Sequence, residues 1–321
     1  MKLGIAGTGK IVQEALPVIL EIWPEYICLM GRERSAERTA RLYEQYHLDA
    51  YVLDFESLLF SQADTIYIAL PNQLHYEYAK QALQAGKNVI LEKPAAVRRR
   101  ELEALFSMAD ASGCILVEAM TLHYLPAFLS LKEKVSDLGT IKLVNFQFCQ
   151  YSSRYDAFRR GEISPAFDPA CAGGALMDLN VYNLHAIIGL FGKPLSAAYY
   201  PNMERGIDTS GVLIMDYGSF RAVSMAAKDC QAPVSSTIQG TQGCIRIPVP
   251  ANGLDRYEVL NNAMDSVLYD FSCGRHRMYW EFAEFSRIID EKDFSAAVRT
   301  RQISLDVLDV LDRVRTPSSR L

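Results

Sequence analysis

One stretch, residues 63–94, constrains the fold of this chain more than any other. It reads as an apolar strand at 65–70, a polar loop, a helix that ends at Gly86, and a second apolar strand at 88–91. Two apolar strands joined by a helix predict a parallel pair, because parallel neighbours need a crossover connection of this length. The charged turn Glu92-Lys93-Pro94 follows at the carboxyl end of the second strand, the edge at which open α/β sheets bind ligands.

The same alternation begins at the N-terminus. A short apolar strand at residues 2–6 leads into the loop Gly7-Thr8-Gly9, and a helical pattern follows. Further strands are predicted at 26–30, 50–53 and 115–118, and further helices at 35–46, 74–85 and 99–111. We therefore predict a Rossmann-type dinucleotide-binding domain with a doubly wound parallel sheet over residues 1–120.

The pattern changes after residue 120. Between residues 195 and 271 strand follows strand, separated by turn signals at 217–219, 240–243 and 252–253. We predict an α+β substrate-binding and oligomerisation domain over residues 121–321, with a large, mostly antiparallel open sheet. Helices are expected at 126–138, 176–190, 278–290 and 302–314, and the terminal helices could pack back on the first domain.

Charge and composition narrow the class of protein. The net charge of −5 gives no electrostatic reason to expect a nucleic-acid partner. The seven cysteines are odd in number and none are spaced as C-x-x-C, which fits reduced thiols and indicates no metal site. The N-terminal apolar stretch is too short for a signal peptide, and no run of about 18 apolar residues predicts a membrane span. We expect a cytoplasmic protein without nucleic-acid, membrane or metal partners.

The loop Gly7-Thr8-Gly9, with Lys10 and Ile11, lies between the first strand and the first helix. Glycines there let the backbone turn tightly and approach a pyrophosphate, which binds the free N–H groups of the helix N-terminus. Because strand, loop and helix come in the right order, we assign dinucleotide binding to these five residues. Val12 stands where the usual fingerprint has a third glycine, which predicts a slightly displaced helix.

The end of the second strand bears on the choice of cofactor. An Asp or Glu usually lies there when the cofactor lacks a 2′-phosphate, since the acid accepts hydrogen bonds from the ribose. This chain has Gly31 at that place, followed by Arg32, whose guanidinium can bind a phosphate bidentately and stack on adenine. The sequence therefore favours NADP, with NAD possible. The alternative is a surface arginine paired with Glu33.

Together the glycine loop, the segment Leu70-Pro71-Asn72 with His75, and the turn Glu92-Lys93-Pro94 resemble the Gfo/Idh/MocA family of nicotinamide-dependent oxidoreductases. The resemblance implies that the loop from Leu70 lines the nicotinamide ribose. It also implies that Lys93 lies beside the nicotinamide and the substrate hydroxyl, where an ammonium would stabilise a developing alkoxide. Glu92 would orient the lysine or a ribose. For His75, a capping or packing role is as good an interpretation as cofactor contact.

A second motif, Gly173-Gly174 followed by Asp178, Tyr182 and His185, is predicted to open the helix at 176–190. The last three are spaced i, i+4 and i+7, so they would share one helix face. The tyrosine resembles the subgroup of glucose-fructose oxidoreductase, dimeric dihydrodiol dehydrogenase and NADP-linked xylose dehydrogenase. The resemblance implies Tyr182 as the general acid/base, assisted by Lys93, and Asp178 as the residue that binds a substrate hydroxyl. The alternative is an ordinary helix start with the tyrosine on the core side.

Two departures from the subgroup concern the substrate. Thr121 and His123 stand where the subgroup has a tryptophan and an arginine, and Asn180 replaces a usual glycine. Substrate specificity therefore does not transfer from the subgroup to this chain. His123 and Arg154 are candidates for substrate contact.

The resemblance implies an NAD(P)-dependent oxidoreductase that transfers hydride between nicotinamide and a secondary alcohol or carbonyl carbon of a sugar, polyol or cyclic diol. The alternative is a non-catalytic NADP(H)- or sugar-sensing regulator on the same scaffold, since fold does not determine function. The combination of Lys93, Asp178 and Tyr182 speaks against a sensor. An open sheet needs cover on its second face, so we expect a homodimer or larger homo-oligomer.

Overall fold

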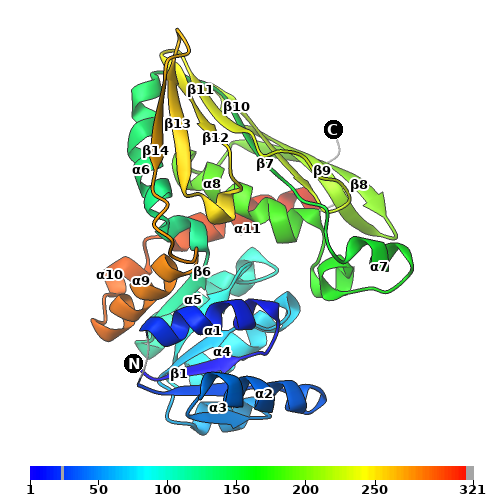
Figure 1. Ribbon diagram of the computed structural model, residues 1–321, viewed down its shortest axis with the longest axis vertical. Coiled ribbons are helices and arrows are strands. Elements are labelled where there is room, and N and C mark those ends of the chain that lie inside the picture. Colours follow the sequence, from blue (N-terminus) through cyan, green and yellow to red (C-terminus); the bar gives the residue numbers. More distant parts are fainter. Residues whose placement is uncertain (23–24, 316–321) are drawn as a thin grey trace. The chain divides into compact units, whose positions relative to one another are not determined.

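The computed structural model describes residues 1–22 and 25–315, whose course Figure 1 shows. The chain divides into two compact units. Met1–Met120 and Met278–Gln302 form the first, and Thr121–Arg277 forms the second with the chain from Ile303 onward. The segment 278–302 therefore belongs with the N-terminal residues, although it follows the second sheet in the sequence. The assignment of dinucleotide binding to one domain and substrate binding to the other stays a prediction.

Among the described residues, six parallel strands form the sheet of the first unit, in the order β3-β2-β1-β4-β5-β6. They are β1 (Leu3–Ala6), β2 (Ile27–Met30), β3 (Ala50–Val52), β4 (Thr65–Ile68), β5 (Asn88–Glu92) and β6 (Leu116–Ala119). The residues of β1, β2, β4 and β6 are all buried, as expected of strands covered on both faces. The strand order reverses at β1, between β2 and β4. The predicted doubly wound parallel sheet is confirmed.

The helices of the first unit connect these strands or follow the second sheet. They are α1 (Lys10–Ile22), α2 (Ala36–Tyr46), α3 (Phe55–Phe60), α4 (His75–Gln84), α5 (Arg99–Ser112), α9 (Tyr279–Asp290) and α10 (Phe294–Ala297). Each amphipathic helix buries its apolar stripe; in α1 this includes Val12, Leu16 and Ile19.

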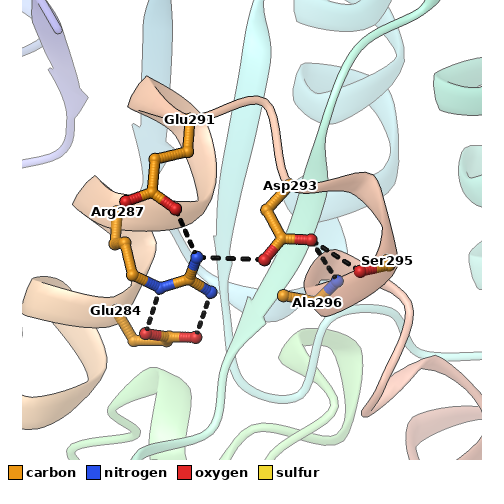
Figure 2. Close-up of polar contacts among 6 residues, drawn as sticks. All are labelled: Glu284, Arg287, Glu291, Asp293, Ser295 and Ala296. Carbon is orange, nitrogen blue, oxygen red and sulfur yellow. Dashed lines mark hydrogen bonds and ion pairs between the residues drawn. The ribbon is translucent and has the colours of Figure 1, made fainter.

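An ion-pair network holds the turn between α9 and α10 (Figure 2). The Arg287 guanidinium donates to both carboxylate oxygens of Glu284, at 2.9 and 2.7 Å. It also donates to Glu291 at 2.7 Å and to Asp293 at 2.9 Å. Asp293 accepts the backbone N–H of Ala296 at 2.9 Å and so caps α10. A planar guanidinium shared by several carboxylates is the arrangement in which exposed ion pairs contribute to stability.

The sheet of the second unit has eight strands in the part of the chain that the structure describes, in the order β14-β13-β12-β11-β7-β10-β9-β8. They are β7 (Ile141–Cys149), β8 (Ser196–Glu204), β9 (Ile207–Asp216), β10 (Arg221–Ala227), β11 (Ser236–Gly240), β12 (Gly243–Ile247), β13 (Arg256–Asn261) and β14 (Ser266–Asp270). Within the described chain, β7 and β10 pair in parallel, and the other neighbours in this sheet are antiparallel. The predicted mostly antiparallel sheet is confirmed.

Helices cover one face of this sheet. The helices of the second unit are α6 (Pro126–Lys134), α7 (Tyr155–Arg159), α8 (Val181–Phe191) and α11 (Arg301–Arg315), the last beginning in the first unit. Helix α8 packs on β7 and β10, and α6 packs on β13 (Figure 1). Alternate residues of β7, namely Val144, Phe146 and Phe148, are buried, which is the period of a strand with one covered face.

Within the described residues, no helix is both long and apolar enough to cross a membrane. All seven cysteines lie in the described part of the chain, and none of them forms a disulfide. No group of three or more His, Cys, Asp or Glu side chains in residues 1–22 and 25–315 is arranged to hold a metal ion.

Candidate functional site

The glycine loop between β1 and α1 requires a glycine at its first position. Gly7 has φ +131°, and a Cβ added there would lie 2.5 Å from the carbonyl oxygen of Ala69. The N–H of Gly7 donates to the carbonyl of Met30 at 3.0 Å, which ties the loop to the end of β2. The backbone can therefore pass close to a ligand at the N-terminus of α1, where helix N–H groups are available to an anion.

A pocket of about 300 Å³ opens beside this loop in the first unit. It combines the glycine loop, the end of β2 and the loop after β4; its lining includes Gly7, Thr8, Gly9, Arg32, Arg34, Arg38, Leu70 and Pro71. Six of the predicted cofactor-binding residues thus lie around one cavity. Arg34 and Arg38 were not predicted to line this pocket. Both follow Arg32 closely in the sequence, Arg34 on the 3₁₀ turn Glu33–Ser35 and Arg38 on α2. Three guanidinium groups near a helix N-terminus fit a dinucleotide that carries an additional phosphate.

The remaining predicted cofactor residues lie outside this lining. Lys10 and Ile11 form the first turn of α1, and Asn72 begins the short 3₁₀ turn before α4. Glu92 ends β5, and Lys93 follows it. All of them lie at or after the carboxyl ends of parallel strands in the first unit.

The position after β2 leaves no room for a side chain unless its neighbours move. A Cβ at Gly31 would overlap the Oγ1 atom of Thr39 on α2. The following turn is fixed by Ser35, whose hydroxyl donates to the carbonyl of Arg32 at 2.9 Å and accepts its N–H at 3.0 Å. Close packing therefore disfavours the carboxylate that would meet an unphosphorylated ribose, and the Ser35 hydrogen bonds fix the backbone that carries Arg32.

His75 ties two loops of the first unit together. It is fully buried at the start of α4, with Nδ1 2.9 Å from the carbonyl oxygen of Pro94 and Nε2 2.8 Å from that of Leu70. Burial lowers the pKa of His75, and the two carbonyl acceptors oppose that shift. The histidine therefore holds the loop after β4 against the turn after β5. Direct contact with a cofactor stays a prediction.

Glu92 is held by its neighbours at the end of β5. It is buried and accepts the hydroxyl of Tyr67 at 2.6 Å and the backbone N–H of Lys93 at 3.1 Å. On β6, Glu118 accepts the N–H of Ala95 at 2.8 Å, on the far side of the cis Lys93–Pro94 peptide. These contacts fix the backbone on both sides of Lys93, whose side chain is half-buried. Tyr67 was not predicted as part of the site.

In the second unit, Asp178 and Tyr182 lie on a helix whose start differs from the prediction. The expected regular helix at 176–190 begins as a π-helical turn, Leu176–Asn180, and continues as α8. A π turn holds more residues than an α turn, so the i, i+4 argument for a shared face does not apply unchanged to Asp178 and Tyr182. Tyr182 is buried, with its ring centroid 6.1 Å from that of Phe148 on β7.

Lys228, which the sequence argument did not single out, contacts the predicted site residue Asp178. It directly follows β10, and its ammonium donates to Asp178 Oδ2 at 2.8 Å and to the carbonyl oxygen of Ala166 at 2.6 Å. The sequence feature that could have identified Lys228 is its place directly after an apolar strand. Its partner lies 50 residues away in the chain, so no local pattern connects the two.

Asp208 on β9 holds the start of the same helix. Its Oδ2 accepts the N–H of Leu176 at 2.7 Å and the hydroxyl of Tyr199 at 2.8 Å. Burial raises the pKa of both Asp208 and Tyr199. A cavity of about 400 Å³ adjoins these side chains, and Met177 also lines it.

The other predicted substrate residues lie apart within the second unit. His123 is buried, with Nε2 3.0 Å from Nδ1 of the buried His185, so one ring donates to the other. Arg154 is exposed at the start of α7. Asn180 is fully buried at the end of the π turn, where its Oδ1 accepts from the Ser224 hydroxyl and, at 3.0 Å, from Asn183. Asn180 therefore packs against β10.

The buried histidine pair predicts a loss of stability in acid. Burial, then the neighbouring His185 and Lys132, lower the pKa of His123 well below its usual range. The unfolded chain takes up a proton below its ordinary pKa of about 6.5, whereas folded His123 stays neutral. Its contribution is therefore present above about pH 6.5 and falls by up to about 1.4 kcal/mol per pH unit as the pH drops toward the folded pKa.

Urea unfolding between pH 7.5 and 5.5 measures this dependence. His123→Phe, which can pack against the ring of Phe128 nearby, is expected to flatten it, and His276→Gln at an exposed histidine is the control. If the free energy of unfolding has the same pH slope in the unmodified protein and in His123→Phe, then His123 takes up no proton on unfolding in this pH range.

The first unit combines a parallel sheet with a glycine-loop pocket, and the second is an α+β unit with a large open sheet, an architecture that fits a nicotinamide-dependent oxidoreductase. Residues 1–120 match the family described as "Oxidoreductase family, NAD-binding Rossmann fold" (GFO_IDH_MocA). The scyllo-inositol 2-dehydrogenase (NADP(+)) IolU of Bacillus subtilis is 32% identical over 320 residues, which cover 98% of this chain and 96% of the relative. The chain therefore belongs to the Gfo/Idh/MocA family.

Two further comparisons agree. The D-xylose 1-dehydrogenase (NADP(+)) of Hypocrea jecorina is 22% identical over 353 residues, covering 97% of this chain and 90% of that protein. The crystal structure of KijD10, a 3-ketoreductase from Actinomadura kijaniata with NADP and TDP-benzene, has a TM-score of 0.84 at 20% identity and covers 98% of this chain and 97% of that one, which shows a common fold. The protein is an NAD(P)-dependent oxidoreductase acting on CH–OH groups, and the comparisons favour this function over a non-catalytic sensor.

Proposed function

We propose that the protein is an NADP-linked dehydrogenase or reductase that interconverts a secondary alcohol and a carbonyl on a polyol, with a cyclic polyol as the first candidate. The observation that carries this proposal is the near full-length similarity to a scyllo-inositol dehydrogenase, combined with a cofactor pocket lined by three arginines. A sugar or a cyclic diol is the second candidate, supported by the more distant xylose dehydrogenase.

The first unit supplies the residues that would hold the cofactor. The glycine loop and the N-terminus of α1 would bind the pyrophosphate, and Arg32, Arg34 and Arg38 would bind a 2′-phosphate. Asn72 and the loop from Leu70 would position the nicotinamide ribose, and His75 fixes that loop from behind. When bound, the nicotinamide supplies or accepts the hydride.

The protein's own residues would handle the proton and the substrate hydroxyls. Tyr182 Oη would take the hydroxyl proton during oxidation and return it during reduction. Lys93 would stabilise negative charge on the tyrosine and on the substrate oxygen. Asp178 would accept a hydrogen bond from a second substrate hydroxyl, and its ion pair with Lys228 is consistent with an uncharged substrate.

A substrate panel tests the function. Inositols, linear polyols, aldoses and dihydrodiols are each added with NADP⁺, and formation of NADPH is followed by its absorbance. We expect turnover of at least one cyclic polyol and weaker turnover of aldoses. If the protein binds NADPH but turns over none of these compounds, nor their ketones in the reverse direction, then the polyol proposal is wrong.

We also propose a cytoplasmic location. All seven cysteines lie in the described chain without a disulfide, which fits a reducing compartment. Fractionation of the producing cells would test this.

We further propose a homodimer formed through the face of the second sheet that α6 and α8 leave open. Strand register places Tyr200, Val212 and Met225 in one row of this face. Ile214 and Val223 lie in the next row. Tyr200 and Ile214 are 52% and 40% exposed, which is high for large apolar side chains on the edge strand β8 and its neighbour β9. A second copy of the same face would cover both rows at once, as two-fold symmetric dimers do.

Ile214→Arg is expected to shift the protein from dimer to monomer at micromolar concentration, because it places a charge in the centre of the apolar rows. Light scattering measures the mass. Phe60→Arg, at an exposed apolar residue on α3 of the first unit, is the control and should leave the mass unchanged. A monomeric unmodified protein would contradict the proposal directly.

A further inference from the structure

Lys228 combines features that packing alone does not explain. Its side chain is 3% exposed, yet it carries an ammonium, which loses several kcal/mol of hydration on burial. Replacing a buried ion pair by apolar residues often leaves a protein as stable or makes it more stable. A buried lysine is therefore weak evidence for a stabilising role, and its contacts indicate a role in the site.

The backbone of Lys228 is fixed on two sides. Its N–H donates to the carbonyl of Thr209 at 2.8 Å, and its carbonyl accepts the N–H of Ser152 at 2.9 Å. These bonds continue the pairing of β10 with β9 on one side, and with the chain that follows β7 on the other, by one residue beyond the end of β10. The Lys228 side chain therefore extends from a strand end whose backbone is fixed.

The ammonium connects the end of β10 to two other segments of the second unit. Besides Asp178, it contacts the loop before the π turn through the Ala166 carbonyl and lies 4.5 Å from the centroid of the Phe167 ring. Phe167 is fully buried in a cluster with Phe158 and Ile207, so this part of the loop is anchored. One cation thus fixes the Asp178 carboxylate against both the sheet and the loop. The Asp178 side chain is 35% exposed, so the carboxylate remains within reach of a ligand.

We infer that Lys228 is a positioning residue that orients the Asp178 carboxylate for binding a hydroxyl group of an uncharged polyol. This inference rests on the proposed function of Asp178. A carboxylate on a π turn can rotate about its side-chain torsions, and the contact at Oδ2 limits that rotation. Lys228 also balances the charge of Asp178, so that the pair presents a hydrogen-bond acceptor without a net charge.

The test compares variants of Lys228 on a substrate identified by the panel. Lys228→Met removes the cation, and Lys228→Gln removes it while keeping an amide that can donate to Ala166. Each is expected to raise the KM for the polyol by about 10-fold, with a smaller change in kcat and with the Kd for NADPH within about 2-fold of the unmodified protein. Lys228→Arg should restore part of the loss. Lys142→Met, at an exposed lysine on β7, is the matched control.

A double-mutant cycle with Asp178→Asn tests whether Lys228 acts on the substrate through Asp178. If Lys228 acts through Asp178, Lys228→Gln should change kcat/KM by less than about 2-fold once Asp178 is Asn. An equal loss in both backgrounds, or an unchanged KM in the folded Lys228→Gln variant, would overturn the inference. If Lys228→Met does not fold, the Lys228→Gln cycle decides alone. Full activity of Asp178→Asn, or no turnover by the unmodified protein, would instead count against the proposed function.

Discussion

Tyr182→Phe is expected to lower turnover by about 10²- to 10⁴-fold on a confirmed substrate, because it removes only the hydroxyl that would carry the proton. The phenylalanine keeps the ring that packs against Phe148, so the fold of the second unit should persist. The Kd for NADPH should change little, since the tyrosine lies in the second unit and would act on the substrate. Initial rates and fluorescence titration of NADPH measure the two effects separately.

Tyr217→Phe is the matched control for this prediction. The Tyr217 hydroxyl donates to the carbonyl of Gly192 in a surface turn of the same unit, so its removal should leave turnover unchanged. Near-normal turnover by Tyr182→Phe would exclude the tyrosine as the proton carrier and leave Lys93 or His185 as the candidates.

Lys93→Met is expected to cause a loss of similar size, about 10²- to 10⁴-fold. Because the lysine would work partly by tuning the tyrosine, the two effects should not add, and the double variant should be little worse than the poorer single variant. Strictly multiplicative losses would mean that the two residues act in separate steps.

NADPH should bind more tightly than NADH, and Arg32→Ala should narrow the difference. Loss of one charge-assisted phosphate contact costs about 1.5–3 kcal/mol, which corresponds to about a 10- to 150-fold weaker NADPH affinity. The affinity for NADH should stay nearly constant, since that cofactor has no 2′-phosphate. Calorimetric titration with both cofactors measures the difference.

The arginine pocket provides its own controls. Arg34→Ala and Arg38→Ala should weaken NADPH binding in the same direction, because both residues line the pocket. Arg41 lies on α2 one turn beyond Arg38, outside the lining, and Arg41→Ala should change neither affinity. Tighter binding of NADH than NADPH by the unmodified protein would refute the assignment of the 2′-phosphate.

Local patterns predicted most of the first unit. The helix expected at 99–111 is found as Arg99–Ser112, and the helix expected at 278–290 as Tyr279–Asp290. These elements have strong apolar periodicity and clear ends, such as Gly113 in the left-handed conformation after α5. Short helices were missed, among them α3 and α7, because five or six residues carry too little periodicity to be distinguished from a turn.

The helix that carries Asp178 and Tyr182 shows where pattern reasoning reached its limit. The apolar spacing predicted a regular helix from 176, but the structure has a π turn before α8. The N–H of Leu176 is bound by Asp208, and Asn180 is held by Ser224 on β10. Both partners come from later strands, so the shape of this turn depends on contacts that the local sequence does not contain.

The sequence by itself determined the order of elements: a parallel sheet with its glycine loop, then a mostly antiparallel sheet. Its motifs also marked Lys93 and Tyr182, whose catalytic roles stay predictions. These features are local, because strand and helix periodicity, glycine conformation and the residues of a turn are set within a few positions of each other. Only the tertiary structure decided that Lys228 pairs with Asp178, 50 residues away, and that His123 pairs with His185, 62 residues away. Such pairs depend on strand register and on how helices pack on the sheet, which involve the chain as a whole.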